Sequence, residues 1–514
     1  MSRLCACMLF ILVALPTFAQ EIPDIRFESS SIPNAGNIAL ILSSPVISGE
    51  VAKQFNQATE NRLQEALNML ELAPGESKDI ALYGIAPFQH IFVTILGENP
   101  SSDKVTWQDM GGSKMAMFRS HSLTEQVSVV IDIEGQTADS AAHFALGAML
   151  RGYQFNKYKK TSAITTSPAI ALYTVVAKEA NTVFNRDLRH LGQGVYLARN
   201  MASEPGKSIY PQAFVDVVKT AFKGVDNIDM DVLDLRDMRK NKMGALIGVG
   251  QGSIHEPRLL VIEYNGADDD SAPLALVGKG ITFDTGGISI KQNSGMWAMK
   301  SDLSGAAAVA GTILAAAQRG EKINLVGLMP LAENMPAEDA IRPGDVLTTM
   351  EGTTIEIIST DAEGRLILAD AVTYAQQAFN PRMLVNIATL TGSAARALSD
   401  EYAAVITRDW ELAEHMMMLG KQAGENVWPL PLHPNHFKQI SSDIADIKNS
   451  GAGNPGASIG AAVVGTFIDE ALPWVHLDIA GVDYLSEATD TTPKGAAGWG
   501  VRFMDEIVRS EASK

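Results

Sequence analysis

The chain has 514 residues, of which 46% are hydrophobic, 19% charged and 6% aromatic, and this composition excludes disordered, collagen-like and coiled-coil proteins. The formal net charge is −18 and no run of Lys and Arg forms a basic stripe, so we expect no nucleic-acid partner. At roughly 150 residues per domain, the length favours two to three domains, and the pattern along the chain fits two.

The first 19 residues have the pattern of a secretory signal peptide. Arg3 precedes an apolar stretch over residues 4–15 that is too short to span a membrane comfortably, and the segment ends in Thr17-Phe18-Ala19, a small-x-small cleavage site. An uncleaved anchor or a buried first helix is the alternative, but Pro16 and the polar residues that follow favour cleavage near Ala19.

Cysteine usage adds to this interpretation. The only cysteines are Cys5 and Cys7, and both lie inside the cleaved segment. After cleavage the protein has no disulfide and no thiol nucleophile, which excludes a cysteine protease. No later segment is long and apolar enough for a membrane span, so we expect an exported protein, periplasmic or secreted.

Residues 20–195 alternate between short apolar runs and helical periodicity, which predicts an N-terminal α/β domain. Apolar runs fall at residues 38–44, 80–85, 90–96 and 127–133, and helical patterns at 51–72 and 140–158. A charged stretch of helical period over residues 178–200 ends at Glu204-Pro205-Gly206, as expected of a linker helix closed by breakers. We place the domain boundary there, after residue 195.

Residues 196–514 alternate strand and helix candidates again, which predicts a mostly parallel central sheet covered by helices. The candidates fall at residues 214–222, 230–235, 258–264, 273–280, 305–318, 323–331, 354–359, 365–378, 383–390, 403–407 and 475–481. The predicted fold class is therefore α/β, with an N-terminal α/β domain joined by a linker helix to a C-terminal catalytic α/β domain. Ligands of such sheets collect at the carboxyl ends of the strands.

Two strand-to-helix junctions of this second domain are rich in charged residues. They supply four acids and three cations: Asp284, Asp302, Asp361, Glu363, Lys279, Lys291 and Arg365. Four carboxylates at one sheet edge balance two divalent ions, which need bridging carboxylates to offset their repulsion. A lysine in such a place loses its proton more readily than an arginine, but the charge count leaves the role of each lysine open.

Each acid alone has a plainer explanation, because Asp302, Asp361 and Glu363 would also serve as helix caps. The glycine pairs Gly278/Gly280 and Gly286/Gly287 favour a binding site over caps, since they let the backbone approach a ligand closely. Other motifs are weak or missing. The match to GxGxxG at residues 451–456 lacks a preceding strand, and the nine histidines form no HExxH.

Several segments resemble the leucyl (cytosol) aminopeptidase family, the M17-type dinuclear metalloproteases. These segments are ARNMASEPG, VGKGITFDTGGISIK, MKSDLSGAAAV, TDAEGRLILADA, NIATLTG, WVHLDIAG and GWGVRF. The resemblance spans essentially the whole second domain. It implies a hydrolase that releases N-terminal residues, preferably leucine and other apolar ones, from peptides with a free amine. The first domain would be the family's variable N-terminal domain, by position and length.

The resemblance also implies a role for each charged residue. The metal ligands would be Lys279, Asp284, Asp302, Asp361 and Glu363, with Asp284 and Glu363 bridging both ions. Lys291 would stabilise the developing oxyanion, and Arg365 would hold a bicarbonate that acts as general base. Zn²⁺ and Mn²⁺ both suit such oxygen-rich ligands.

The positions that match the family's pocket for the first side chain are Met299, Ser359, Thr389, Leu390 and Gly392, although each is also compatible with ordinary packing. Members of the family commonly form homohexamers whose active sites face an interior cavity, so the resemblance implies a homohexamer that acts on peptide substrates. Two alternatives stay open from the sequence: a non-catalytic binding or structural protein on the same fold, and a dipeptidase of the Cys-Gly type. The ligand set, complete by residue type and spacing, argues against the first.

Overall fold

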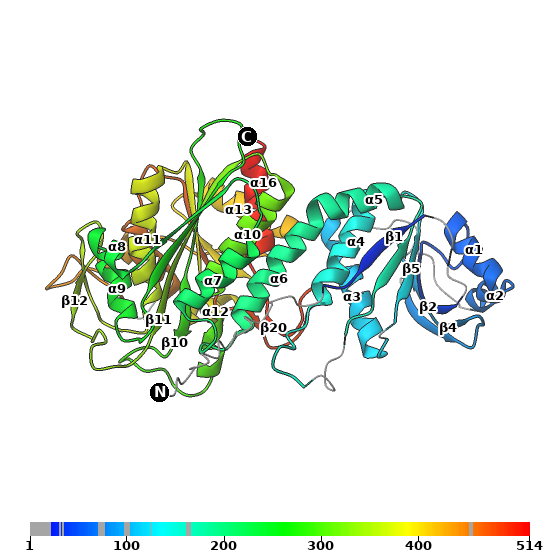
Figure 1. Cartoon of the computed structure of the whole chain (residues 1–514), viewed down its shortest axis with the longest axis horizontal. Helices are drawn as coiled ribbons and strands as arrows, with labels where there is room; N and C mark the ends of the chain where they lie inside the picture. Colours follow the sequence, from blue (N-terminus) through cyan, green and yellow to red (C-terminus); the bar gives the residue numbers. More distant parts are fainter. Residues whose placement is uncertain are drawn as a thin grey trace, which may run out of the picture.

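The computed structural model describes residues 22–29, 32, 35–69, 78–96, 103–123, 125–160, 166–451 and 456–514. They form two α/β domains that lie side by side and are joined through a long helix, α6 (Arg189–Ser203) (Figure 1). The export signal expected at residues 1–19 lies outside the described residues. Within the described ranges, no helix is both long and apolar enough to cross a membrane.

The first domain is built on a six-stranded sheet in the order β1-β6-β5-β2-β4-β3. Its strands are β1 (Ile25–Glu28), β2 (Gly36–Leu42), β3 (Lys78–Tyr83), β4 (Phe88–Ile95), β5 (Val127–Asp132) and β6 (Ile170–Tyr173). Every neighbouring pair is parallel except β3 with β4 at one edge. The central strands β2 and β5 are buried along nearly their whole length, as expected for a parallel sheet covered on both faces.

Helices cover both faces of this sheet. On one face lie α1 (Glu50–Ala58) and α2 (Arg62–Asn68), whose Phe55 and Leu63 pack against Leu40. On the other lie α3 (Lys104–Ser120) and α4 (Ala138–Arg151), whose Phe118 and Phe144 pack beside Ile41 and Val129. The alternation of Leu40 and Ile41 between the two faces follows the period of two in a strand.

A nearly continuous helical run connects the domains. It consists of α5 (Ala177–Val183), a π-helical turn at Phe184–Leu188, and α6, which ends where Glu204 turns to extended backbone before Pro205. The helix α6 packs closely on α10 (Ser304–Arg319), because Gly194 faces the carbonyl of Gly311. A Cβ at Gly194 would lie 2.3 Å from that carbonyl oxygen, so only glycine allows this approach.

The second domain is built on a nine-stranded sheet in the order β16-β15-β18-β14-β9-β11-β8-β7, with β10 paired to β11. Its strands are β7 (Ile228–Leu233), β8 (Arg258–Asn265), β9 (Leu274–Gly278), β10 (Gly280–Asp284), β11 (Asn324–Asn334), β14 (Met383–Ala388), β15 (Ala403–Ile406), β16 (Val427–Pro429) and β18 (Trp474–Asp478). The inner pairs β18-β14-β9-β11 are parallel, and β7, β8 and β15 run antiparallel to their inner neighbours. The mostly parallel sheet expected from the sequence is confirmed.

Helices cover both faces of the second sheet as well. On one face lie α6, α7 (Pro211–Ala221), α10, α13 (Trp410–Ala423) and α16 (Val501–Ala512). On the other lie α8 (Leu235–Lys240), α9 (Gly244–Gly250), α11 (Gly364–Phe379) and α15 (Gly456–Gly465). The strand β9 packs against both layers of helices. Leu274 and Leu276 face the first layer, and Ala275 and Val277 face the second.

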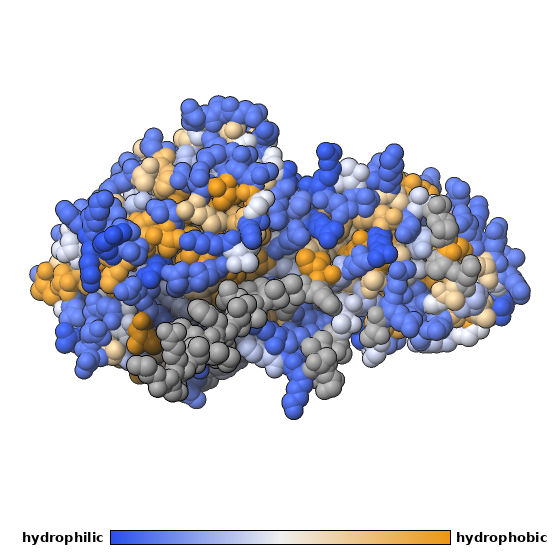
Figure 2. Space-filling view, in the orientation of Figure 1, coloured by the Kyte–Doolittle hydropathy of each residue, from blue (hydrophilic) through white to orange (hydrophobic). Residues whose placement is uncertain are grey.

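Short elements complete the domain at its rim. They are η3 (Met296–Ser301), α12 (Gly392–Leu398), α14 (Pro434–Gln439), a small sheet of β12 (Val346–Thr348), β13 (Thr354–Glu356) and β17 (Ile447–Lys448), and the pair β19 (Tyr484–Leu485) and β20 (Gly495–Ala496). Hydrophilic residues cover much of the face in Figure 2, and apolar residues gather at the far end of the second domain, beyond β12. Val346 and Ile444 are exposed large apolar residues of this small sheet and the loop before β17.

Candidate active site

The site is built on a break between two strands, β9 and β10, at the carboxyl end of the central sheet. The strands β9 and β10 pair in turn with β11, first at Leu325–Leu328 and then at Leu331–Asn334. Lys279 sits at the break between them, and β10 ends at Asp284. Both side chains are buried, with relative exposures of 3% and 2%. The sheet thus delivers an ammonium and a carboxylate to its carboxyl edge, where ligands of such sheets bind.

Close packing against α10 forces this geometry on the backbone. A Cβ at Gly278 would lie 2.4 Å from the carbonyl oxygen of Gly305, so the strand can pass the start of α10 only with glycine there. The backbone of Lys279 then forms hydrogen bonds to β14 and to α10. Its amide donates to the carbonyl of Ile387, and its carbonyl accepts from the amide of Ala306. These bonds fix where the lysine side chain starts.

Asp302 reaches the site from between η3 and α10. Its Oδ1 accepts from Lys279 Nζ at 2.9 Å and from the hydroxyl of Thr389 at 2.5 Å. Lys279 Nζ also pairs with Glu363 Oε1 at 2.9 Å and donates to the carbonyl oxygen of Thr389 at 2.8 Å. All three ammonium protons of Lys279 therefore have acceptors, two of them carboxylates.

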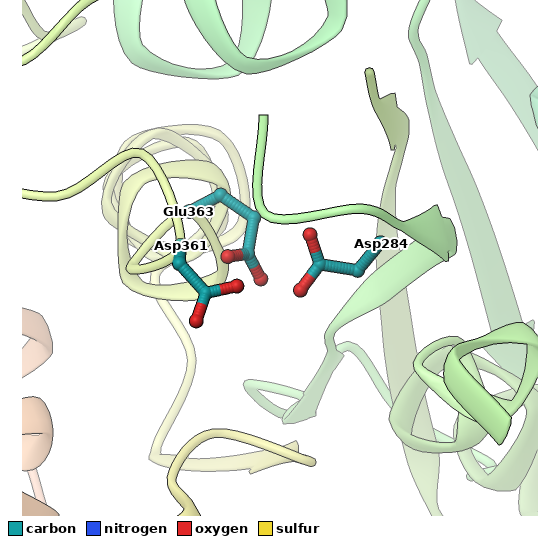
Figure 3. Close-up of side chains that lie close together, drawn as sticks. All are labelled: Asp284, Asp361 and Glu363. Atoms are coloured by element: carbon teal, nitrogen blue, oxygen red, sulfur yellow. The ribbon is translucent and has the colours of Figure 1, made fainter. Parts of the chain in front are cut away.

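The other two acids come from the loop before α11. Asp361 and Glu363 turn their carboxylates toward Asp284, as Figure 3 shows. One oxygen from each of the three carboxylates lies within 4.8 Å of the others, a spacing that suits a shared metal ion. Asp284 and Glu363 are buried, whereas Asp361 is exposed to solvent. The site is therefore closed on the side of the sheet and open on the side of Asp361.

Lys291 and Arg365 are the other two cations that the sequence predicts at the site. Lys291 Nζ pairs with Asp284 Oδ2 at 2.7 Å and with Asp361 Oδ1 at 2.5 Å, and its side chain is 23% exposed. Arg365 is buried in the first turn of α11, where Nη1 donates to the carbonyl of Asn449 at 2.8 Å. Its Nε is buried without a partner among the described residues.

The lysines of the site supply too little positive charge to keep all of its buried carboxyl groups ionised. Burial, with the neighbouring Glu363, raises the pKa of Asp284 to about 6, against the opposing effect of Lys291. Burial also raises the pKa of Asp302 well above its ordinary value. For Lys279, burial alone would lower the pKa, but the surrounding carboxylates outweigh it and raise the pKa. A further cation would stabilise the ionised acids.

The residues present fit divalent metal ions. The cluster offers four carboxylates against the two ammonium groups of Lys279 and Lys291, and hard divalent ions take carboxylate ligands. Asp302 Oδ2 is buried and has no hydrogen-bond partner in the part of the chain that the structure describes. An orphaned carboxylate oxygen inside a protein is costly, and a metal ion would satisfy it.

A cavity of about 220 Å³ adjoins Asp361 and Arg365. Of the five positions predicted to bind the substrate, Ser359, Leu390 and Gly392 line it, and Met299 and Thr389 do not. Thr389 instead holds Lys279 and Asp302 through its carbonyl and hydroxyl oxygens. The structure thus brings the seven charged residues and three of the pocket positions together, and gives Thr389 a different contact.

Three polar residues that sequence reasoning missed hold the loops of the site. Asn334 donates from Nδ2 to Asp284 Oδ1 and to the carbonyl of Thr360. Asn449 donates to the carbonyls of Ser359 and Ala362, and Asp478 accepts from the amides of Leu390 and Thr391. Asn334 and Asp478 are the last residues of strands β11 and β18. A polar residue at the carboxyl end of a predicted strand is the sequence signal that would have identified both.

A mostly parallel sheet with carboxylates and lysines gathered at its carboxyl edge defines an α/β metallohydrolase. A family model described as the catalytic domain of the cytosol aminopeptidase family matches residues 196–504, and one described as the family's N-terminal domain matches residues 43–162. The chain belongs to the cytosol aminopeptidase family.

Relatives and solved structures agree with this assignment. Two proteins described as probable cytosol aminopeptidases, from Methylorubrum populi and a Chelativorans species, are 37% and 38% identical, covering 94% and 95% of this chain and 95% and 98% of their own. A mutant of tomato leucine aminopeptidase superposes with a TM-score of 0.81 at 26% identity, covering 95% of this chain and 96% of that one. The bottromycin maturation enzyme BotP in complex with Mn superposes with a TM-score of 0.78 at 26% identity, covering 93% and 99%.

Proposed function

We propose that this chain, a metal-dependent aminopeptidase of the cytosol aminopeptidase family, cleaves the first peptide bond of peptides with a free N-terminus. The residues that would hold two divalent ions are Lys279, Asp284, Asp302, Asp361 and Glu363. The observation that carries the proposal is the convergence of these five side chains from three segments of the chain, with Asp302 Oδ2 buried and without a partner among the described residues. Family membership supports a two-metal site, and Zn²⁺ or Mn²⁺ would occupy it.

Bound divalent ions polarise the scissile carbonyl and make hydroxide available near neutral pH. The chain's own residues then decide where the substrate lies. Lys291 is the ammonium nearest the open side of the cluster, and there it would stabilise the negative charge that develops on the carbonyl oxygen. Lys279 is enclosed by three acceptors. It is therefore placed to be a metal ligand and not to contact the substrate.

Arg365 would hold a bicarbonate as general base. It is buried, its Nε has no partner among the described residues, and it borders the cavity beside Asp361. A buried guanidinium with an unused donor favours a small anion. Ser359, Leu390 and Gly392 in the wall of the same cavity would receive the substrate, with leucine and other apolar first residues preferred.

Export and assembly belong to the same proposal. The basic, apolar and small-residue pattern of residues 1–19 supports cleavage near Ala19 and a periplasmic or secreted protein. Edman sequencing of the protein recovered from culture fractions tests this, since a mature N-terminus near Gln20 is expected and an intact cytoplasmic Met1 would contradict it. Family membership supports a homohexamer, which light scattering of the mature protein would measure.

The activity is tested with leucine p-nitroanilide and its N-acetylated form, using protein stripped of metal and then supplied with Mn²⁺ or Zn²⁺. We expect cleavage of the free-amine substrate only, and only with metal. Asp361→Ala should abolish it, whereas Glu351→Ala, which removes an exposed acid outside the site, should not. Cleavage of the acetylated substrate, or full activity in Asp361→Ala, would contradict the proposal.

A further inference from the structure

A second cavity, of about 480 Å³, lies at the junction of the two domains. The first domain lines it with the ends of α3 and α4 and the segment after α4. The second domain lines it with residues near η3, β19 and β20, and β20 approaches the first domain in Figure 1. No residue assigned above to the metal ligands or to the substrate pocket lines this cavity. It is therefore separate from the site described above.

The charge of this cavity is opposite to that of the chain as a whole. Five cationic side chains line it: Arg119, Arg151, Lys159, Lys300 and Lys494. None of the described lining residues is an Asp or a Glu, although the chain carries a net charge of −18. Cations gathered in a hollow with no acid in its wall repel one another, and this repulsion costs free energy that an anion would relieve.

The two arginines of the cavity have no carboxylate partner in the part of the chain that the structure describes. Within the described ranges, neither Arg119 nor Arg151 has a carboxylate within 4.0 Å, and Arg151 Nε is buried with no hydrogen-bond partner. Burial lowers the pKa of Arg151, and the nearby Arg119 lowers it further, against a raising effect of Asp490. Two guanidinium groups close enough to repel each other offer a paired set of donors.

Lys300, one of the two lysines from the second domain, is also held away from acids. Lys300 Nζ donates to the carbonyl of Ser203 at 3.0 Å and has no carboxylate within 4.0 Å among the described residues. Glu204, the carboxylate whose charge raises the pKa of Lys300 against the effect of burial, is itself fully buried and already pairs with Lys157 and Tyr158, each at 2.6 Å. The charge of Lys300 is therefore available to the cavity.

One buried arginine fixes the two walls of this cavity relative to each other. Arg199, 2% exposed, donates to the carbonyl of Leu150 at 2.6 Å, next to Arg151 in the first domain. Its other nitrogens donate to the carbonyl of Ala497 and to the hydroxyl of Thr492, on either side of Lys494 in the second domain. The backbone segments that carry Arg151 and Lys494 are thus fixed relative to each other before any ligand binds, which lowers the entropic cost of binding.

From this geometry we propose that the junction cavity binds a small multivalent oxyanion of the phosphate class. Tetrahedral oxyanions accept several hydrogen bonds at once, and arginine and lysine donors are the usual ligands of phosphate oxygens. Tyr153, Gln154 and Asn156 in the wall add neutral polar groups. The ligand would be free phosphate or the phosphoryl group of an organic molecule, and binding would tie the two domains together.

The test is calorimetric titration of the metal-loaded full chain with inorganic phosphate and, separately, with phenyl phosphate, at constant ionic strength. We expect saturable binding of at least one probe, and tighter binding of phenyl phosphate would indicate an organic ligand. Lys159→Gln/Lys494→Gln should weaken binding at least about tenfold, since it removes two charge-assisted contacts from exposed positions. Arg151→Gln should weaken it further.

The matched control is Lys219→Gln/Lys223→Gln, which changes the net charge equally at exposed positions outside the cavity. It should leave binding unchanged, and both double variants should keep the thermal midpoint of the free protein. Binding should also raise that midpoint in the unaltered chain and in the control. The proposal is overturned if neither probe binds, or if the cavity variants bind the probes as tightly as the control.

Discussion

Thr391 offers the sharpest test of how the loop after β14 is held. Its hydroxyl donates to the buried Asp478 Oδ2 at 2.6 Å and accepts from the amide of Ala394 at 3.1 Å, where it caps α12. Thr391→Val keeps the shape and removes the hydroxyl. A hydrogen bond to a charged group contributes about 1.5–3 kcal/mol and a cap about 0.5–2 kcal/mol, so the unfolding free energy should fall by about 2–5 kcal/mol.

The same loop carries Thr389, whose carbonyl and hydroxyl hold Lys279 and Asp302, so leucine p-nitroanilide hydrolysis should fall in Thr391→Val as well. Urea unfolding of the metal-loaded protein, followed by circular dichroism, measures the stability change. Thr391→Ser is the matched control, because it keeps the hydroxyl and should cost less than about 1 kcal/mol. A loss below about 1 kcal/mol in Thr391→Val, or equal losses in both variants, would refute this reasoning.

Two further predictions concern pH and packing. Burial lowers the pKa of His476 to about 3, from 6.5 in the unfolded chain, so only the unfolded state gains this proton as pH falls below 6.5. Stability should therefore drop by about 2 kcal/mol between pH 7 and 5 through this residue, and urea unfolding of His476→Gln should show a correspondingly weaker pH dependence. Gly278→Ala should cost about 3 kcal/mol or more in urea unfolding, because its Cβ would meet the backbone of Gly305 at 2.4 Å. Gly392→Ala should unfold like the unaltered chain, since its Cβ meets only the flexible end of Arg396. It should lose activity, because Gly392 lies in the wall of the cavity beside Asp361. Equal stability of the two glycine variants would contradict the packing argument.

The second domain was predictable because local pattern and global fold agree there. Its strands are short apolar runs with the charged residues at their ends, as Lys279 directly follows β9 and Asp284 is the last residue of β10. The carboxyl edge of a parallel sheet gathers such residues whatever their separation in the chain. The charge count left the role of each lysine open, because the partners of a lysine side chain depend on tertiary contacts. The structure distinguishes the enclosed Lys279 from the more accessible Lys291.

The first domain was less predictable, for two physical reasons. The helix α3 escaped notice because its buried face includes Gln108, Gly111, Gly112 and Lys114, which break the apolar period that predicts a helix. The helical pattern over residues 51–72 is divided in the structure, since Asn61 adopts a left-handed conformation with φ of 67° between α1 and α2. Asparagine tolerates that conformation, but its presence alone does not impose it.

Polar residues that support the site were also hidden in the sequence. Asn449 holds the loop of Ser359 and Ala362 from 87 and more residues away, a pairing that no local pattern contains. His476 is a further buried polar residue that no local pattern explains. It is fully buried and its Nδ1 faces Asn386 at 2.7 Å, but its Nε2 has no partner among the described residues.

In the proposed mechanism, the carboxylate cluster holds two divalent ions that are needed for hydrolysis. The most direct measurement is metal content by plasma mass spectrometry, taken alongside leucine p-nitroanilide hydrolysis while Mn²⁺ or Zn²⁺ is added back to stripped protein. We expect two ions per chain at full activity, and a loss of both bound metal and activity in Asp302→Ala. Full activity without metal, or an unchanged metal content in Asp302→Ala, would contradict it.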